Sequence, residues 1–237
     1  MKLSRYKHTS STSYAFGAAL CYELFKTRPT SILHVFLRPE IPHGSDLEHL
    51  LNTLKSAHIE IIESQKPFNI LGAKDSCLLI TEFTKFNTKL DSSANHLVLV
   101  NPSDAGNLGT IIRTAAAMDF NNIAIIDPAV DHFNPKVIRA TMGAIFHQNI
   151  ERFPNFEAYA AKYPRQYFAF MLDGRSQPAE NFTSALAPYS LVFGNEAAGL
   201  PKDFINFCQP VILRQSDQVD SLNLSIAASI AMYLFKQ

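Results

Sequence analysis

After residue 95 the chain alternates strongly apolar segments with segments of helical periodicity, and this alternation restricts the fold more than any other feature. The apolar segments are residues 96–101, 123–127, 166–172 and 190–194. Helices are expected over 108–118, from Pro135 (after the N-cap Asn134) to about 146, and from near Ser221 almost to 237. Strands that are apolar throughout are buried on both faces of a sheet, and the helices between them return the chain to the next parallel strand. The pattern therefore predicts an α/β fold built on a parallel sheet.

The first 90 residues show a smaller α/β pattern of their own. Residues 1–13 are polar and slightly basic, which predicts a flexible arm, and a helix is expected over 14–26. Strands are expected at 32–37, 59–62 and 77–83. A helix between the first two of these strands carries apolar residues at helical spacing, namely Leu47, Leu50, Leu51 and Leu54. The polar stretch that follows, residues 84–95, is typical of a linker. We therefore expect one domain over 1–90 and another over 91–237.

Charge and cysteine content exclude several classes of protein. Lys+Arg and Asp+Glu both number 21, so a protein held to nucleic acid by bulk positive charge is excluded. Residues 1–90 hold 11 basic against 8 acidic residues, so any local RNA-binding patch is expected there. The cysteines Cys21, Cys77 and Cys208 form no CxxC pair, which excludes a disulfide framework and a zinc ribbon. No apolar run reaches the roughly 18 residues of a membrane span. We expect a cytoplasmic protein without a metal or a membrane partner.

The segment that joins the first strand of the second half to its helix, residues 101–113 (NPSDAGNLGTIIR), is the first candidate site. Ligands of parallel α/β sheets bind at the carboxyl ends of strands, where this segment is expected. Gly109 and Arg113 are four residues apart and off the apolar stripe, so a ligand could approach the glycine while the guanidinium faces it. A guanidinium suits a phosphate or a developing oxyanion, and a solvated surface arginine is the alternative. The G-x-G-x-x-G pattern of dinucleotide sites and the P-loop pattern are both absent.

Two further strand-to-helix junctions carry polar residues. Residues 191–201 (LVFGNEAAGLP) place Glu196 between two glycines, where its carboxylate can accept hydrogen bonds from a loop or from a substrate. A role in tying the loop together and a role in catalysis both remain open. Residues 219–233 (VDSLNLSIAASIAMY) begin with the good N-cap residues Ser221 and Asn223 and continue as a helix that is apolar nearly all round. Such a helix must be buried on several sides, under the sheet or in a dimer seam.

Together, these three segments resemble the three signature motifs of the SpoU/TrmH family of RNA 2′-O-ribose methyltransferases, within the SPOUT superfamily. Residues 107–113 (NLGTIIR) resemble the Asn-x-Gly-x-x-x-Arg motif, 194–199 (GNEAAG) the Gly-Asn-Glu-x-x-Gly motif, and 221–227 (SLNLSIA) the Ser-Leu-Asn-Val-Ser-x-Ala motif. Residues 134–143 also resemble the middle helix of the family. The resemblance spans about residues 97–235. Residues 1–90 resemble, more loosely, the L30e-like RNA-binding domain that often precedes this catalytic domain.

The resemblance implies a parallel α/β sheet whose C-terminal part forms a deep trefoil knot. The knot would hold S-adenosyl-L-methionine, and the protein would act as a homodimer through its catalytic domain. Arg113 would be the catalytic arginine, with Asn107 and Glu196 at the substrate end of the site. The implied cofactor-binding residues are Gly194, Asn195, Gly199, Ile212, Leu213, Ser221, Leu222 and Asn223. The implied reaction is methyl transfer to a ribose 2′-hydroxyl of RNA. An L30e-like domain favours rRNA over tRNA as the substrate, by analogy alone.

The chain departs from the family pattern in three places. Residues 211–213 are Val-Ile-Leu where Ile-Pro-Met is usual, Ala197 replaces a common glycine, and Ala105 replaces a common proline. If backbone groups hold the adenine, the first and third changes should be tolerated. These changes bear on the affinity for the cofactor and not on the identity of the family. Two alternatives stay open: an RNA-binding protein of the same fold without catalysis, and a SPOUT enzyme that methylates a base.

Overall fold

The computed structural model of the protein describes residues 3–39 and 44–236. The chain forms two compact units. The first unit consists of Met1–Phe86 with Asp131–Phe146, and the second consists of Asn87–Val130 with His147–Gln237. The segment 131–146, which the sequence pattern placed in the second half of the chain, thus packs with the first. The domain division expected at residue 90 stays a prediction.

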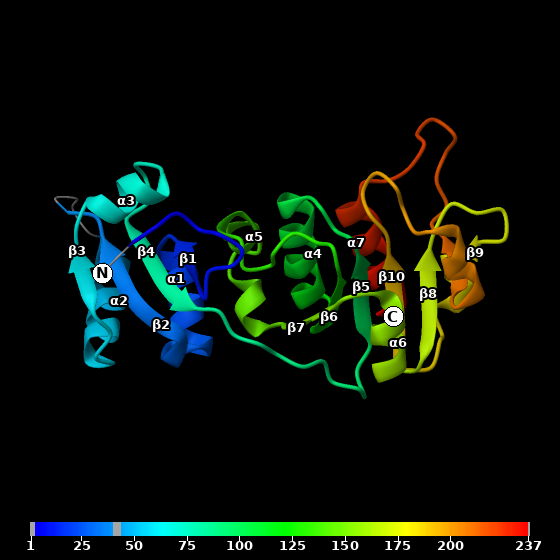
Figure 1. The fold of residues 1–237 in the computed structure, drawn as a ribbon, viewed down its shortest axis with the longest axis horizontal. Coiled ribbons are helices and arrows are strands. Elements are labelled where there is room, and N and C mark those ends of the chain that lie inside the picture. Colours follow the sequence, from blue (N-terminus) through cyan, green and yellow to red (C-terminus); the bar gives the residue numbers. More distant parts are fainter. Residues whose placement is uncertain (1–2, 40–43, 237) are drawn as a thin grey trace. The chain divides into compact units, whose positions relative to one another are not determined.

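The first unit is built on a four-stranded sheet in the order β1-β4-β2-β3 (Figure 1). Its strands are β1 (Thr12–Phe16), β2 (Ile32–Leu37), β3 (Ile61–Glu63) and β4 (Leu79–Thr84). Strand β4 runs antiparallel to β1 and β2, whereas β2 and β3 are parallel. Its α-helices are α1 (Ala18–Thr27), α2 (Ser45–Ser56), α3 (Lys66–Leu71) and α5 (Pro135–Ala140), and a short 3-10 helix, η1 (Pro29–Ser31), precedes β2. The four leucines predicted at helical spacing lie on α2 and are buried in one apolar cluster of this unit.

Three predictions for the first unit are wrong. The helix expected over 14–26 is instead strand β1 followed by α1, because Tyr14 and Ala15 are buried by pairing with β4. The flexible arm expected over 1–13 packs from residue 3 onward, where Arg5 Nε donates to the carbonyl of Ile70 at 3.2 Å. The helix after Asn134 ends at Ala140, and the chain turns through Gly143 (φ 94°) into the 3-10 helix η2 (Ala144–His147). A Cβ at position 143 would lie 2.8 Å from Cγ of Glu23, so only glycine fits this turn.

The second unit is built on a seven-stranded sheet in the order β7-β6-β5-β10-β8-β11-β9. The strands are β5 (His96–Val100), β6 (Asn122–Ile126), β7 (Asn149–Phe153), β8 (Gln166–Phe170), β9 (Gln177–Pro178), β10 (Tyr189–Phe193) and β11 (Gln209–Ile212). Every neighbouring pair in this order is parallel. Each residue of β5, β6 and β10 is buried, which confirms that these apolar segments form the middle of a parallel sheet.

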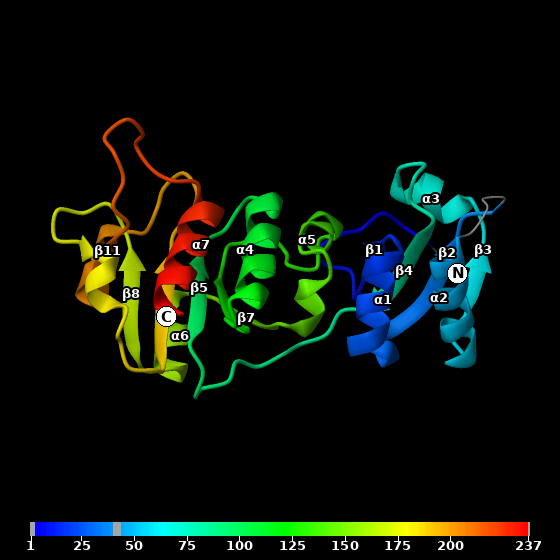
Figure 2. The same ribbon diagram turned by 180° about the vertical axis from the view of Figure 1, so that it is seen from behind.

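Helices cover both faces of the second sheet. The second unit contains α4 (Ala105–Ala117), α6 (Phe156–Lys162), α7 (Leu224–Phe235) and the 3-10 helices η3 (Ala179–Phe182) and η4 (Lys202–Asn206). Helices α4 and α7 pack against each other, as Figure 2 shows, and Ser229 donates to Thr114 at 3.3 Å between them. Helix α6 places Phe156 and Tyr159 in a cluster with alternate residues of β5 and β6, so it covers the opposite face.

The predicted linker contains no helix or strand between β4 and β5. Its later part packs on the second unit, where Thr88 and Ile150 exchange two hydrogen bonds of 2.9 and 2.7 Å. Within the described part of the chain, no helix is long and apolar enough to cross a membrane.

Candidate functional site

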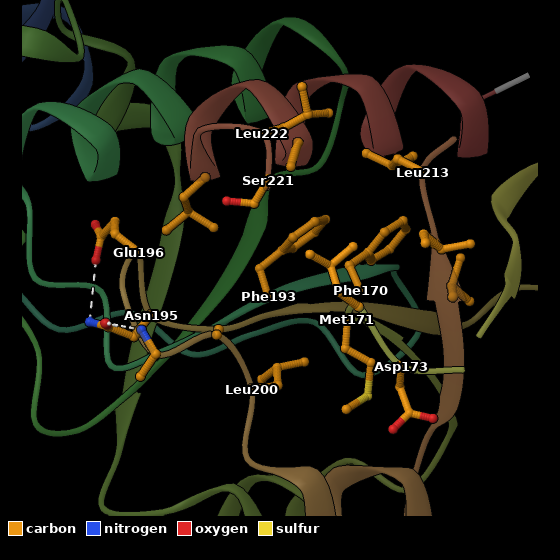
Figure 3. A pocket seen from close by; sticks show the side chains of 18 of the residues that line it. Phe170, Met171, Asp173, Phe193, Asn195, Glu196, Leu200, Leu213, Ser221 and Leu222 are labelled. Atoms are coloured by element: carbon orange, nitrogen blue, oxygen red, sulfur yellow. Dashed lines mark hydrogen bonds between the residues drawn. The ribbon is translucent and has the colours of Figure 1, made fainter. Parts of the chain in front are cut away.

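The carboxyl ends of the neighbouring strands β10, β8 and β11 meet at one edge of the second sheet, and the segments that follow them enclose a cavity of about 550 Å³. The cavity is lined by residues 170–173 at the end of β8, 193–202 at the end of β10, 211–213 and 215 at the end of β11, and 221, 222, 224 and 227 around the start of α7. Figure 3 shows side chains from these segments converging on it. A cavity therefore lies at the carboxyl ends of the parallel strands, where the sequence analysis expected a ligand to bind.

The structure brings most of the predicted site residues to this cavity. The predicted residues that line it are Gly194, Asn195, Glu196, Gly199, Ile212, Leu213, Ser221 and Leu222. Asn107, Arg113 and Asn223 are not among the lining residues. Asn107 and Asn223 instead join Glu196 in one chain of hydrogen bonds, described below.

The loop after β10 is a tight turn that depends on Gly194. The backbones of Asn195 and Gly199 exchange hydrogen bonds of 3.2 and 2.9 Å, and Asn195 Oδ1 accepts from the amides of Ala197 and Ala198 at 2.9 and 3.1 Å. A Cβ on residue 194 would lie 2.1 Å from the carbonyl carbon of Gly199. Because backbone atoms cannot yield to such a contact, glycine is required at 194 for the turn to close.

Glu196 ties this turn to the loop after β5. Its Oε2 accepts from the amide and hydroxyl of Ser103 at 3.1 and 2.8 Å. Its Oε1 accepts from the amide of Asp104 at 3.1 Å and from Asn107 Nδ2 at 3.3 Å. Burial alone would raise the pKa of Glu196, but these hydrogen bonds outweigh it and hold the pKa below its usual value. The carboxylate is therefore ionised at neutral pH, and both of its oxygens are engaged within the protein.

The N-termini of α4 and α7 are joined to Glu196 through side-chain amides. Asp104 caps α4 by accepting from the amide of Asn107 at 2.7 Å. Asn223 caps α7, as predicted, by accepting from the amide and hydroxyl of Ser225 at 2.9 and 2.7 Å. Asn223 Nδ2 also donates to Asn107 Oδ1 at 3.1 Å. Asn107 thus bridges Glu196 and Asn223, so one residue from each of the three sequence segments belongs to a single hydrogen-bonded chain.

Arg113 lies on α4 beyond this chain and is exposed. Among the described residues, none accepts a hydrogen bond or forms an ion pair with its guanidinium. Gly109, which was expected on the same uncovered face, is buried. That expectation is wrong because α7 packs along α4 and covers more of it than the apolar stripe indicates. Arg113 is therefore a cation on α4 with no partner among the described residues.

Sequence reasoning missed the part of the cavity that follows β8. Phe170, Met171 and Asp173 line it, and the ring of Phe170 stacks on that of Phe193 at a centroid distance of 4.5 Å and an interplanar angle of 10°. The available signal was positional: these residues end or follow an apolar strand in a predicted parallel sheet, where ligands bind.

Comparisons with known proteins identify relatives of this chain. A family model described as the SpoU rRNA Methylase family matches residues 94–233. The 23S rRNA (guanosine(2553)-2′-O)-methyltransferase RlmP of Bacillus subtilis is 28% identical over 231 residues, which cover 92% of this chain and 85% of that protein. A putative tRNA (cytidine(34)-2′-O)-methyltransferase of the same organism is 32% identical over 151 residues, covering 59% of this chain and 90% of that protein.

A solved structure shares the fold across nearly the whole chain. The crystal structure of an AdoMet-bound rRNA methyltransferase from Sinorhizobium meliloti superposes with a TM-score of 0.80 and 24% identity. The match covers 95% of this chain and 87% of that one. At this identity the likeness establishes a common fold.

Proposed function

This chain belongs to the SpoU rRNA Methylase family, and we propose from this premise that it transfers a methyl group from S-adenosyl-L-methionine to the 2′-hydroxyl of a ribose in RNA. The convergence of the three sequence segments at the edge of one sheet, beside one cavity, carries the proposal. The two relatives from Bacillus subtilis are named for ribose 2′-O-methylation, one of rRNA and one of tRNA. The rRNA enzyme matches more of this chain, which supports rRNA as the substrate class.

The cavity suits the cofactor in size and in lining. Its volume of about 550 Å³ lies within the range of small-molecule sites. Apolar side chains such as Phe170, Phe193 and Leu224 form one part of the lining, and the turn that Gly194 begins offers backbone groups in another. The residues that would hold the cofactor are Gly194, Asn195, Gly199, Ile212, Leu213, Ser221, Leu222 and, through the start of α7, Asn223. When bound, the cofactor supplies an electrophilic methyl group on a sulfonium.

The residues of the chain would prepare the ribose oxygen. A hydroxyl is a weak nucleophile and must lose its proton during the transfer. A guanidinium does not act as a general base in proteins, so Arg113 would serve by stabilising the developing alkoxide or by holding an adjacent phosphate that takes the proton. Asn107, fixed between Glu196 and Asn223, would position the substrate end of the site. Glu196 acts in this scheme by holding the loops together.

The proposal includes a trefoil knot formed by the C-terminal part of the second unit, an L30e-like RNA-binding role for residues 1–90, and a cytoplasmic location. It also includes a homodimer through the catalytic domain. Helix α7 supports the dimer because Ile226, Ile230 and Tyr233 are 50%, 41% and 58% exposed. Their spacing places them on one face of the helix, and an exposed apolar stripe of this kind favours a partner surface such as a second copy of the chain.

Methyl transfer to total RNA tests the proposal. The purified protein is incubated with labelled S-adenosyl-L-methionine and RNA from cells that lack the gene, and nuclease digestion with mass spectrometry locates the methyl group. We expect it on a ribose; a methylated base would favour the base-modifying alternative. An absence of cofactor binding in calorimetry would favour the RNA-binding protein without catalysis.

The variant Arg113→Ala tests the role of the guanidinium. We expect methyl transfer to fall by about 100- to 1000-fold, the usual loss when a charge-stabilising donor is removed, with cofactor affinity unchanged. Lys236→Ala is the control because it removes another exposed cation of the same unit, one that is paired with Asp119. A parental transfer rate in folded Arg113→Ala would remove this role from Arg113.

A further inference from the structure

The cavity contains two carboxylates, and they are engaged to different extents. Both oxygens of Glu196 accept hydrogen bonds from Ser103, Asp104 and Asn107. The side chain of Asp173 is 19% exposed, and only its Oδ1 is engaged: it accepts from the amide and Nε of Arg175 at 2.9 and 3.0 Å. No described residue donates to Asp173 Oδ2. Figure 3 shows Asp173 beside Met171, on the opposite side of the cavity from Glu196. Asp173 is therefore the acid with an oxygen left for a ligand.

The surroundings of Asp173 favour a neutral hydrogen-bond donor over a cation. The hydrogen bonds from Arg175 hold the pKa of Asp173 below its usual value, so the carboxylate is ionised at neutral pH. The same arginine forms an ion pair with it, which leaves the pair without net charge. Lys202 also lines the cavity and adds a positive charge to it. Because Arg175 and Lys202 already balance the charge of Asp173, a neutral hydroxyl can donate to Oδ2, and a further cation gains little there.

The position of Asp173 in the sheet is that of a ribose-binding acid. Asp173 is the third residue after β8, and β8 pairs with β10, which ends next to Gly194. In dinucleotide-binding α/β folds, an acidic residue at this edge of a parallel sheet accepts hydrogen bonds from ribose hydroxyls. The aromatic pair of Phe170 and Phe193 lies at the same strand ends and provides an apolar surface for a nucleobase.

We propose that Asp173 binds the ribose hydroxyls of the adenosyl group through Oδ2 and so selects a ribonucleoside cofactor. This inference rests on the proposed function, because it takes the cavity to be the cofactor site. It assigns to Asp173 a binding role within that site, and it assigns to Arg175 the role of orienting the carboxylate from the surface side.

Calorimetry with the full chain and four nucleosides tests the assignment. The ligands are S-adenosylhomocysteine, 5′-methylthioadenosine, and the 2′-deoxy and 3′-deoxy analogues of 5′-methylthioadenosine. In the unmodified protein, we expect removal of at least one hydroxyl to weaken binding about 10-fold or more, as for a lost hydrogen bond to a charged group. In Asp173→Ala, 5′-methylthioadenosine should bind about 10-fold more weakly, and the deoxy analogues should differ from it less than about twofold.

Two further variants serve as controls. Asp203→Ala removes an exposed acid on the neighbouring helix η4 that does not line the cavity, and it should leave all four affinities unchanged. Arg175→Ala keeps the amide that donates to Asp173 Oδ1 but loses the Nε donor, so it should weaken the dependence on the ribose hydroxyls without abolishing it. If Arg175→Ala abolishes that dependence, the carboxylate acts only as part of a surface ion pair, and the proposal is overturned.

The outcomes separate this inference from the function on which it rests. If the unmodified protein binds none of the four ligands, the proposed function fails. If it binds the deoxy analogues as tightly as the parent nucleoside, the role of Asp173 is overturned even where Asp173→Ala does not fold. If Asp173→Ala weakens S-adenosylhomocysteine but not 5′-methylthioadenosine, the carboxylate meets the ammonium of the amino acid part. That result overturns the ribose assignment and leaves the function intact.

Discussion

Two loop regions meet at the same edge of the second sheet and differ in how their polar groups are used. In the bonded region, residues 101–107 and 194–199, side chains and amides are joined across the two loops by Glu196, Asn195 and Asn107. In the open loop, residues 213–222, the residues from 216 to 221 are all exposed. Gln215 Nε2 donates to the carbonyls of Val219 and Asp220 at 3.5 and 3.2 Å. Figure 1 shows the open loop projecting from the sheet in orange-red.

The difference indicates that the bonded region and the open loop have different roles. A region whose donors and acceptors are already paired keeps its geometry when a ligand arrives, which suits the groups that must orient a substrate. A loop with few bonds of its own can change shape on binding at low cost, which suits a segment that closes over a cofactor. Asn223 connects the two regions: it directly follows the open loop, and its side-chain amide donates to Asn107 in the bonded region.

Among the changes that test this comparison, the largest effect is expected from Glu196→Ala, which removes the acceptor of five hydrogen bonds in the bonded region. We expect methyl transfer to fall about 100-fold, because small displacements of positioning groups have effects of this size. The free energy of unfolding should fall by only about 1 kcal/mol, since the freed donors are exposed to water. Initial rates and denaturant unfolding measure the two quantities. A parental rate in Glu196→Ala would show that methyl transfer does not depend on the hydrogen bonds of Glu196.

Asn223→Asp should have a smaller effect, because it keeps the cap of α7 but loses the donor to Asn107. We expect an approximately 10-fold loss of methyl transfer with an unchanged free energy of unfolding. Asn223→Ala is the companion variant: it also loses the cap and should cost about 1 kcal/mol of stability. If the two variants are equally active and equally stable, the link between the two regions has no functional role.

Acid should weaken the bonded region through Glu196. Its pKa is lowered in the folded protein, so its stabilising contribution is present above the usual carboxyl value of 4.5 and is lost as the pH falls through the lowered folded value. Other groups titrate in acid, including His96, whose pKa burial lowers to about 4. These other groups contribute equally in the parent and in Glu196→Gln, so their contributions cancel in the difference between the two unfolding free energies. We expect this difference to shrink below pH 4.5; a pH-independent difference would contradict the assignment.

The smallest effect is expected from Asp217→Ala, at an exposed position of the open loop. The free energy of unfolding should change by less than about 0.5 kcal/mol, as for other surface substitutions, and thermal unfolding measures it. A large loss of stability would show that the open loop is held by contacts in the free protein, and the comparison would then fail.

Much of the second sheet could be predicted from sequence because its pattern is locally unambiguous. The apolar segments at 96–101, 123–127 and 190–194 have no competing helical period, and Asn134 and Asn223 are strong N-cap residues that the structure uses as such. The three sequence segments could be assigned to one edge of the sheet because parallel strands all present their carboxyl ends there.

Other features depend on contacts between residues far apart in the chain. The run from Tyr14 suits a strand or a helix, and its pairing with β4, more than sixty residues later, decides for the strand. The engagement of Glu196 by Ser103 and Asp104 depends on two loops folding together.

The packing of segment 131–146 has a practical consequence for dividing this protein. Phe133 and Phe146 of this segment contact Phe83, and Phe133 also contacts Phe86, with ring centroids 5.0 to 6.1 Å apart. The carbonyl of Phe133 accepts from Ser13 at 2.5 Å. A fragment that starts at residue 91 would keep the whole motif-bearing region. It would lack Phe83 and Phe86, so Phe133 and Phe146 would become exposed to solvent. An exposed aromatic surface of this kind promotes aggregation. A minimal enzyme cut from this chain would therefore need polar substitutions on the exposed surface around Phe133 and Phe146.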